Sequence, residues 1–522
     1  MAILLDKKLD PQLTLKTRLA PNELFGPFYR EVSWLEDGFH LSSIIMAKRK
    51  RNNDGTAPVA TPVPSIKATP SKKAKHSENV TKNDGPIHIQ IVTGSYDRIL
   101  HGITATFSTT ASTTEFADIF LFDAHTSAIR CLAISPPSAP VPKQTQKVIL
   151  ASGSTDQRIN LYHLSAHAPR KVSKPSLLNN GRRVVENAQN KELGALLHHA
   201  STVTALSFPT RSKLLSSAED STIAVTRTRD WSLLSTIKAP IPKVVGRPSG
   251  DTAPLGGAPA GVNDFAVHPS MKIMISVGKG EKVMRLWNLV TGKKAGILEF
   301  RRKDLSEIGE GRFGSGEGRK LAWGNTQDGE EFCVAFDRGI LVYGMNSEPK
   351  CKVISPGRTK MHKVEYVSVG DNEDRSVLAV STEDGRILFY STATADITND
   401  DGKEDTLPCA KLIAQLGGKE SGILGRIKDF KLLRASDRTF VITANSEGKI
   451  GLWTLEMSEL RVHEAKEAKQ VGKLSGTYET GNRVTCLEGF VMLPTPEADE
   501  LEEDINSPMA EGKDEDSDSD SE

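Results

Sequence analysis

The sequence has few of the features that mark secreted, membrane-spanning or metal-binding proteins. Five cysteines are present in 522 residues, and no two of them are spaced as Cys-x-x-Cys, which excludes the common zinc and dithiol patterns. This small, odd number suits a reducing compartment inside the cell. No apolar run approaches the ~20 residues that cross a bilayer, and the N-terminus lacks the charged-then-apolar order of a signal peptide. We therefore expect an intracellular protein without a membrane partner.

Motifs that carry catalysis are also missing. The sequence holds no His-Glu-x-x-His, no Walker loop and no Gly-x-Ser-x-Gly elbow. Residues 278–282 and 311–318 come closest to a phosphate loop, but neither precedes a helical pattern that could supply a helix N-terminus. We expect no enzyme activity, no catalytic, cofactor-binding or metal-binding residue, no cofactor and no small-molecule substrate.

What the sequence does contain is a repeated β-hairpin pattern. Each copy is an apolar run, a small-residue or glycine step, a turn rich in Asp, Glu or Gly, and a second apolar run. Two such runs joined by a turn predict a hairpin. Seven copies are found, at residues 89–103, 148–164, 213–228, 272–289, 331–345, 376–391 and 439–455. A unit that recurs in this way is typical of a solenoid, a propeller or an array.

Further apolar runs between the hairpins give each unit four short strands, which is one propeller blade. Long insertions at residues 165–193 and 392–407 separate some units. The first hairpin lacks a preceding strand, and the last apolar run, at residues 483–490, lacks a following hairpin. Pairing these two segments avoids open strand edges. We predict an all-β, seven-bladed propeller over residues 87–492, closed by N- and C-terminal strands.

Single residues recur at equivalent places in these units. An aromatic residue ends the third strand in five of them, as Tyr162, Trp287, Tyr343, Tyr390 and Trp453. Aspartates fall in the hairpin turns, as Asp156, Asp220, Asp337 and Asp384, and histidines precede inner strands, as His125, His199 and His362. This arrangement resembles the His–Ser/Thr–Asp–Trp hydrogen-bonded set of WD40 blades, although no unit has a strict Trp-Asp ending. Recurrence at one position per blade indicates turn chemistry rather than catalysis, because an active site needs unlike groups that converge.

The formal net charge is only +1, but the charges are unevenly distributed. Residues 1–86 form a basic extension and residues 493–522 an acidic tail rich in Ser, Asp and Glu, and we expect most of both to be disordered. Two basic clusters predict nuclear import, namely Lys48, Arg49, Lys50 and Arg51, and Lys72, Lys73 and Lys75. Ser517 and Ser519 each have an acidic residue three positions on, which suits phosphorylation by acidophilic kinases. The composition changes abruptly at Met46, so residues 1–45 are either a partner-binding segment or lie before the natural start.

Two basic insertions are candidates for contact with RNA or with a partner. The first carries Arg170, Lys171, Lys174, Arg182 and Arg183. The second carries Arg301, Arg302 and Lys303, with Arg312, Arg319 and Lys320 close behind. Such surfaces attract phosphate backbones through counterion release, without sequence specificity. The alternative is that both are ordinary solubilising loops.

One stretch is more specific than the repeat itself. Residues 264–296 contain His268-Pro269-Ser270, Ser276-Val277-Gly278 and Trp287-Asn288-Leu289, together with Arg285 and Gly292. This string resembles the signature blade of a ribosome-assembly WD40 family, which includes the fungal maintenance-of-killer WD40 factor and the animal p21-activated-kinase-interacting protein. Further stretches agree in order near residues 91, 425 and 482, so the resemblance covers roughly residues 87–490.

The resemblance implies a nuclear and nucleolar scaffold for assembly of the large (60S) ribosomal subunit, with a part in rRNA processing. Its partners would be pre-60S particle proteins and rRNA. In animals the same family is linked to p21-activated kinase, so an adaptor that binds and inhibits such a kinase is the alternative. The import clusters and the acidic Ser-rich tail favour the first function.

Overall fold

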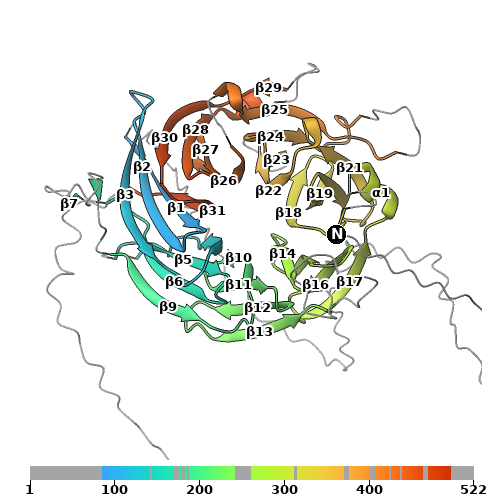
Figure 1. Ribbon diagram of the computed structural model, residues 1–522, viewed down its shortest axis with the longest axis horizontal. Coiled ribbons are helices and arrows are strands. Elements are labelled where there is room, and N and C mark those ends of the chain that lie inside the picture. Colours follow the sequence, from blue (N-terminus) through green and yellow to red (C-terminus); the bar gives the residue numbers. More distant parts are fainter. Residues whose placement is uncertain are drawn as a thin grey trace, which may run out of the picture.

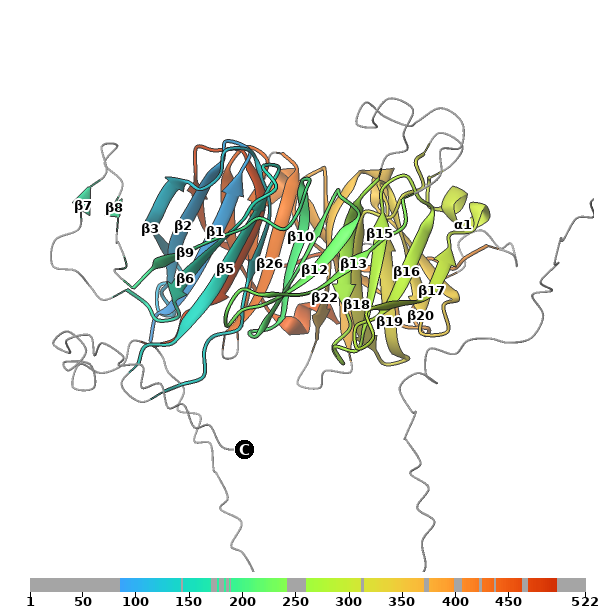
Figure 2. The same cartoon turned by 90° about the horizontal axis from the view of Figure 1, so that it is seen from below.

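The computed structural model describes residues 85–141, 144–169, 176–177, 183–184, 187, 189–241, 260–310, 314–369, 375–398, 406–421, 425–435, 438–461 and 468–494. These residues form seven β-sheets arranged as a ring, seen face on in Figure 1. In the side view of Figure 2, the strands run across the thickness of the ring. The basic clusters at 48–51 and 72–75 and the acidic tail with Ser517 and Ser519 lie outside the described residues.

Each blade holds four strands in antiparallel order, from the innermost strand to the outermost. Blade 1 consists of β31 (Val484–Val491), β1 (Ile87–Ser95), β2 (Ile99–Phe107) and β3 (Thr114–Asp123). Blade 2 consists of β4 (Ile129–Ile134), β5 (Lys147–Ser154), β6 (Ile159–Ser165) and β9 (Lys191–Leu196). Blade 3 consists of β10 (Val203–Thr210), β11 (Lys213–Ala218), β12 (Thr222–Arg227) and β13 (Leu233–Lys238).

The remaining four blades follow the chain in the same order. Blade 4 consists of β14 (Val262–Val267), β15 (Ile273–Gly278), β16 (Val283–Asn288) and β17 (Lys293–Glu299). Blade 5 consists of β18 (Lys320–Thr326), β19 (Gly329–Ala335), β20 (Gly339–Gly344) and β21 (Pro349–Ile354). Blade 6 consists of β22 (Met361–Ser368), β23 (Ser376–Thr382), β24 (Arg386–Ser391) and β25 (Lys411–Gly417). Blade 7 consists of β26 (Ile427–Ala435), β27 (Arg438–Asn445), β28 (Lys449–Leu455) and β30 (Lys473–Glu479).

The seven predicted hairpins are the second and third strands of the seven blades, which confirms the propeller prediction. The small-residue step before the turn has a steric cause. A Cβ on Gly94 would lie 2.6 Å from the Ile129 side chain of blade 2, and one on Gly153 would lie 2.7 Å from Val203 of blade 3. The inner strand of the next blade therefore packs against the hairpin at the glycine, where the hairpin itself carries no side chain.

The hydrophobic core lies between neighbouring blades. Phe107 of blade 1 and Phe440 of blade 7 are both buried, and their rings meet edge to face with centroids 5.2 Å apart. Such a pair is worth about 0.5–1.5 kcal/mol beyond the burial of its apolar area. Because each blade packs against both of its neighbours in this way, the ring depends on being closed.

Closure follows the predicted route. Strand β31 pairs antiparallel with β1, from Ile89 opposite Val491 to Ser95 opposite Val484. The C-terminal strand thus becomes the inner strand of the blade that the N-terminal hairpin begins. No edge is left open at this seam, which is how a propeller avoids pairing with other chains.

Several smaller elements were not predicted. The connection from blade 4 to blade 5 contains helix α1 (Arg302–Glu307), and three short 3-10 helices lie at Pro356–Arg358, Lys419–Ser421 and Met457–Leu460. In blade 2, the long insertion contributes β7 (Ser176–Leu177) and β8 (Arg183–Val184), and β8 bridges the outer strand of blade 1. Strand β29 (Lys469–Gln470), from the connection within blade 7, pairs with the outer strand of blade 6. Among the described residues, no helix is long and apolar enough to cross a membrane.

Six of the seven inner strands carry a register shift near their first residues, and only β18 lacks one. Three side chains at this shift donate to a backbone carbonyl of the next blade. Thr485 reaches Ile129 at 2.6 Å, Thr204 reaches Val262 at 2.7 Å, and Asn263 reaches Gly318 at 2.9 Å. A β-bulge changes the direction in which a side chain points. Here it directs a polar side chain to a hydrogen bond with the next blade.

Candidate functional site

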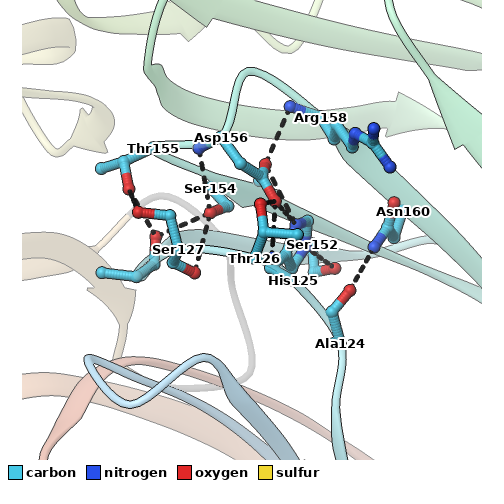
Figure 3. A network of polar contacts seen from close by, with 12 residues as sticks. Ala124, His125, Thr126, Ser127, Ser152, Ser154, Thr155, Asp156, Arg158 and Asn160 are labelled. Carbon is cyan, nitrogen blue, oxygen red and sulfur yellow. Dashed lines mark hydrogen bonds and ion pairs between the residues drawn. The ribbon is translucent and has the colours of Figure 1, made fainter.

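His125 is held in a hydrogen-bonded network at the turn of blade 2, shown in Figure 3. Its Nε2 lies 2.8 Å from the Ser152 hydroxyl, and its Nδ1 lies 3.0 Å from the Asp156 carboxylate. That carboxylate also accepts the backbone N–H groups of Thr126 and Arg158, each at 3.0 Å. Burial lowers the pKa of His125 even though Asp156 opposes the shift. A neutral imidazole with both nitrogens occupied is a structural group rather than a catalytic base.

Blade 3 repeats this network. His199 Nε2 lies 2.8 Å from the Ser216 hydroxyl, and Nδ1 lies 3.3 Å from Asp220. Burial opposes ionisation of Asp220, but hydrogen bonds from His199, Thr222 and the Ala200 backbone hold its pKa below the usual range. The predicted turn role of Asp156 and Asp220 is therefore confirmed.

The two tryptophans of the predicted set, Trp287 and Trp453, belong to blades 4 and 7. Trp287 Nε1 donates to the Ser276 hydroxyl at 2.8 Å, and Trp453 Nε1 donates to Thr443 at 3.3 Å. Blades 2 and 3 thus keep the His–Ser–Asp part of the WD40 set, and blades 4 and 7 keep the Ser/Thr–Trp part. His268 of the specific string bonds Ser270 at 2.8 Å across the turn between β14 and β15, so this motif also shapes a turn.

The prediction for His362 was wrong. His362 lies inside strand β22 rather than before an inner strand, and its Nε2 has no hydrogen-bond partner among the described residues. Burial, followed by the positive charges of Lys428, Lys360 and Arg426, lowers its pKa to about 4. The histidine therefore marks a basic environment rather than a turn.

This environment extends over four blades on the face that carries the hairpin turns, hereafter the turn face. In blades 6, 7 and 1 the residue before the inner strand is basic, and its carbonyl accepts from the turn of the same blade. Lys360 accepts from Glu383 at 2.9 Å, Arg426 from Ser446 at 3.1 Å, and Arg483 from Tyr96 at 2.8 Å.

Blade 5 adds Arg319, which contacts the turn residue Asp337 at 2.6 Å. In blades 2, 3 and 4 the equivalent residues are Ala128, Thr202 and Gly261, with the same backbone bonds. We call Arg319, Lys360, Arg426, Lys428 and Arg483 the basic arc. It covers one side of the ring only.

Deeper in the ring, basic residues of blades 6 and 7 are matched by carboxylates. Lys363 lies 2.7 Å from Asp429, and Lys431 lies 3.2 Å from Glu488. Burial opposes the charge on Lys363, but Asp429 and Glu488 outweigh it and raise its pKa. These two pairs carry no net charge, whereas the arc has five cations and its ion pairs use two carboxylates, Asp337 and Glu383.

Apart from Arg319, the residues of the two predicted basic insertions are not part of the basic arc. Arg183 is in β8 beside the outer strand of blade 1, and Arg170, Lys171, Lys174 and Arg182 lie outside the described residues. Arg301, Arg302 and Lys303 lie at α1, whose Glu307 pairs with Lys352 on the outer strand of blade 5 at 3.2 Å. Figure 1 shows β7, from the same insertion as β8, and α1 at opposite sides of the rim, so the structure does not join the two insertions into one surface.

Burial makes four of the five thiols poor nucleophiles. Burial raises the pKa of Cys131 to about 12, and it raises the pKa values of Cys333, Cys351 and Cys486 as well. In the part of the chain that the structure describes, no group of three or more His, Cys, Asp or Glu residues could hold a metal ion.

Comparison with known proteins agrees with this architecture. The family model "WD domain, G-beta repeat" matches residues 117–163 and 190–225. Protein MAK11 of Saccharomyces cerevisiae is 28% identical over 402 residues, which are 72% of this chain and 76% of that protein. A p21-activated protein kinase-interacting protein 1-like from Gallus gallus is 25% identical over 76% of this chain and 79% of its own length. Shk1 kinase-binding protein 15 of Schizosaccharomyces pombe is 22% identical over 80% of this chain and 88% of its length. The chain is a seven-bladed β-propeller that contains WD40 repeats, and over 72% and 76% of its length it is similar to MAK11 and to a p21-activated protein kinase-interacting protein 1-like.

Proposed function

We propose that this protein is a non-enzymatic scaffold for assembly of the large (60S) ribosomal subunit, acting in the nucleus and nucleolus on pre-60S proteins and rRNA. The observation that carries the proposal is the basic arc, because exposed arginines and lysines on a rigid closed ring suit a particle rich in RNA phosphates. The similarity to MAK11 and the specific string of blade 4 support the same function.

The polar groups of the turn face support a role without chemistry. His125 and His199 have both ring nitrogens within hydrogen-bond distance of side chains in their own blade. A reaction requires an acid, a base or a nucleophile that faces a substrate. A binding surface requires only a fixed arrangement of charges, which the propeller provides.

The test is sedimentation of a tagged chain from cell extract, combined with depletion of the protein. We expect the chain in pre-60S fractions as well as free, and we expect depletion to reduce large-subunit precursors while small-subunit precursors stay nearly unchanged. Replacing Arg170, Lys171, Lys174, Arg182 and Arg183 with Gln should weaken particle association if the blade 2 insertion takes part. Normal ribosome profiles after depletion would contradict the proposal.

A second function is favoured by the names of several relatives, which are described as kinase-interacting or kinase-binding proteins. In that case the chain is an adaptor that binds and inhibits a p21-activated kinase. Co-purification of such a kinase, with higher kinase activity after depletion and unchanged ribosome profiles, would establish the adaptor instead of the scaffold.

A further inference from the structure

We propose that the basic arc and the side chain of Tyr96 together bind a segment of single-stranded RNA on the turn face of blades 5, 6, 7 and 1. The proposal rests on the proposed function, which it deepens by naming the ligand class and the residues that hold it. Such a site needs more positive than negative charge and a surface on which bases can stack. It also needs a feature that favours RNA over an acidic protein.

The surplus of charge is visible in the ion pairs of the arc. Asp337 is shared by Arg319 at 2.6 Å and Lys360 at 3.1 Å, so one carboxylate serves two cations. Arg426 pairs with Glu383 at 3.2 Å. Within the described residues, Lys428 and Arg483 make no ion pair with a carboxylate side chain. A bound chain of phosphates would supply the missing negative charge.

Within the arc, Lys428 lies in a setting that disfavours its positive charge. Burial, followed by the positive charges of Arg426 and Arg483, lowers the pKa of Lys428. Lys428, Lys360 and Arg426 act in the same direction on the pKa of His362, whose Nε2 has no partner among the described residues. Positive side chains that outnumber the carboxylates paired with them attract polyanions and speed their association.

Tyr96 supplies the stacking surface. It lies at the tip of the blade 1 hairpin, and 59% of its surface is exposed. The Arg483 guanidinium lies 5.3 Å from the centroid of its ring, which fixes the aromatic side chain next to the arc. An exposed ring beside a basic track is the arrangement by which proteins hold single-stranded nucleic acid, with bases stacked on the ring and phosphates on the cations.

The aromatic ring of Tyr96 favours RNA over an acidic or phosphorylated peptide as the ligand. A phosphorylated or acidic peptide would use the arc but would gain little from Tyr96, because its charged groups have no flat face. Duplex RNA keeps its bases stacked inside the helix, so its bases cannot reach the ring. A single strand offers both phosphates and unstacked bases. A site of this kind takes on the order of 10 nucleotides.

The experiment uses the purified full chain and a fluorescently labelled oligouridine of about 15 nucleotides. We expect salt-sensitive binding, measured by fluorescence anisotropy. Combining Arg426→Gln, Lys428→Gln and Arg483→Gln should weaken binding about tenfold or more, and should lower the slope of log affinity against log salt by about 2, because about 0.7 is lost per phosphate contact on a single strand.

A matched control removes three exposed lysines of blade 4 by Lys272→Gln, Lys293→Gln and Lys294→Gln. These lie away from the arc, and we expect less than a twofold change in affinity. Tyr96→Phe should bind like the parent, whereas Tyr96→Ala should lose about tenfold if one base stacks on the ring. Melting temperatures of all variants should match the parent, which separates loss of the site from loss of the fold.

The proposal is overturned if the arc variant binds oligouridine as tightly as the parent, if the control triple weakens it equally, or if Tyr96→Ala has no effect. It is also overturned if a phosphoserine peptide of equal charge binds through the arc and the oligouridine does not. Pre-60S sedimentation of the arc variant is measured in parallel. A chain that sediments normally but never binds RNA would refute this inference and leave the scaffold function standing.

Discussion

The Asp97 carboxylate accepts a hydrogen bond from the backbone N–H of Arg483 at 3.2 Å, although 386 positions separate the two residues in the sequence. Tyr96 next to it donates its own N–H to the Arg483 carbonyl. The turn of the first hairpin and the start of the last strand are therefore joined by both side chain and backbone. These two hydrogen bonds hold the start of β31 against the turn between β1 and β2, where the propeller closes.

Removing the chain from Asn482 onward should destabilise the whole ring. The deletion takes away β31, exposes the edge of β1 and uncovers the interface between blades 7 and 1. We expect a loss of soluble protein and a fall in melting temperature of at least ~5 °C. Deleting only residues 495–522 is the control and should leave the melting temperature unchanged. Equal stability of both truncated chains would contradict this account of closure.

Acidification should weaken the fold between about pH 6.5 and pH 4. Burial lowers the pKa values of His198 and His362 to about 4 in the folded chain. Unfolded histidines have a pKa of about 6.5, so in this window the unfolded chain binds more protons. The free energy of unfolding is therefore highest above this window and falls as the pH drops through it.

Urea unfolding at pH 7.5 and at pH 5 measures this dependence. Combining His198→Gln with His362→Gln should flatten it, because glutamine does not titrate. A double variant with the same loss of stability at pH 5 as the parent would show that other groups cause the effect.

The ion pair between Lys363 and Asp429 should be needed for stability. Asp429 also accepts the backbone N–H of Leu487 at 2.8 Å, so its two roles can be separated. Asp429→Asn removes the charge and keeps a side chain of similar shape, and should cost about 1–3 kcal/mol by leaving the Lys363 ammonium group without its ion-pair partner. Asp429→Ala should cost more, since the Leu487 N–H loses its acceptor as well. Chemical denaturation would test the order of these two losses.

Nuclear entry should depend on the two basic clusters of the N-terminal extension. Replacing Lys48, Arg49, Lys50, Arg51, Lys72, Lys73 and Lys75 with Ala should leave a fluorescently tagged chain largely cytoplasmic. Replacing Arg302 and Lys303 instead is a control of similar kind on the propeller. An undiminished nuclear signal in the cluster variant would mean that another segment or a bound partner carries the protein in.

The hairpins could be predicted from sequence because their pattern is local. Each consists of two apolar runs around a turn, and a continuously buried pair of short strands with a Gly or Asp turn is recognisable without knowing the neighbours. Helix α1 was missed because six residues give too short a periodic signal, and β29 was missed because two residues pair only where the chain crosses to another blade.

Apart from Arg319, which follows the second predicted basic insertion, the basic arc was missed for a different reason. Four of its five members precede inner strands that are far apart in the sequence, and Lys428 lies inside one of them, β26. Inner strands are the least regular part of each repeat. A signal was present, because Arg319, Lys360, Arg426 and Arg483 each stand just before such a strand. Aligning the seven units on their inner strands would have revealed it. His362 was misplaced because its inner strand begins at Met361 and not after the histidine.

Arg483 belongs both to the seam that closes the ring and to the arc on the turn face. Its backbone completes the pairing of the two chain ends, and its side chain lies over Tyr96 among the other cations. By mass action, an anion that binds the arc favours the state in which this residue is in place. Occupancy of the arc and retention of the terminal strand are thus thermodynamically linked. A ligand on the turn face would slow the detachment of β31 from β1. In turn, a change that destabilises the pairing of β31 with β1 would lower the affinity for the ligand.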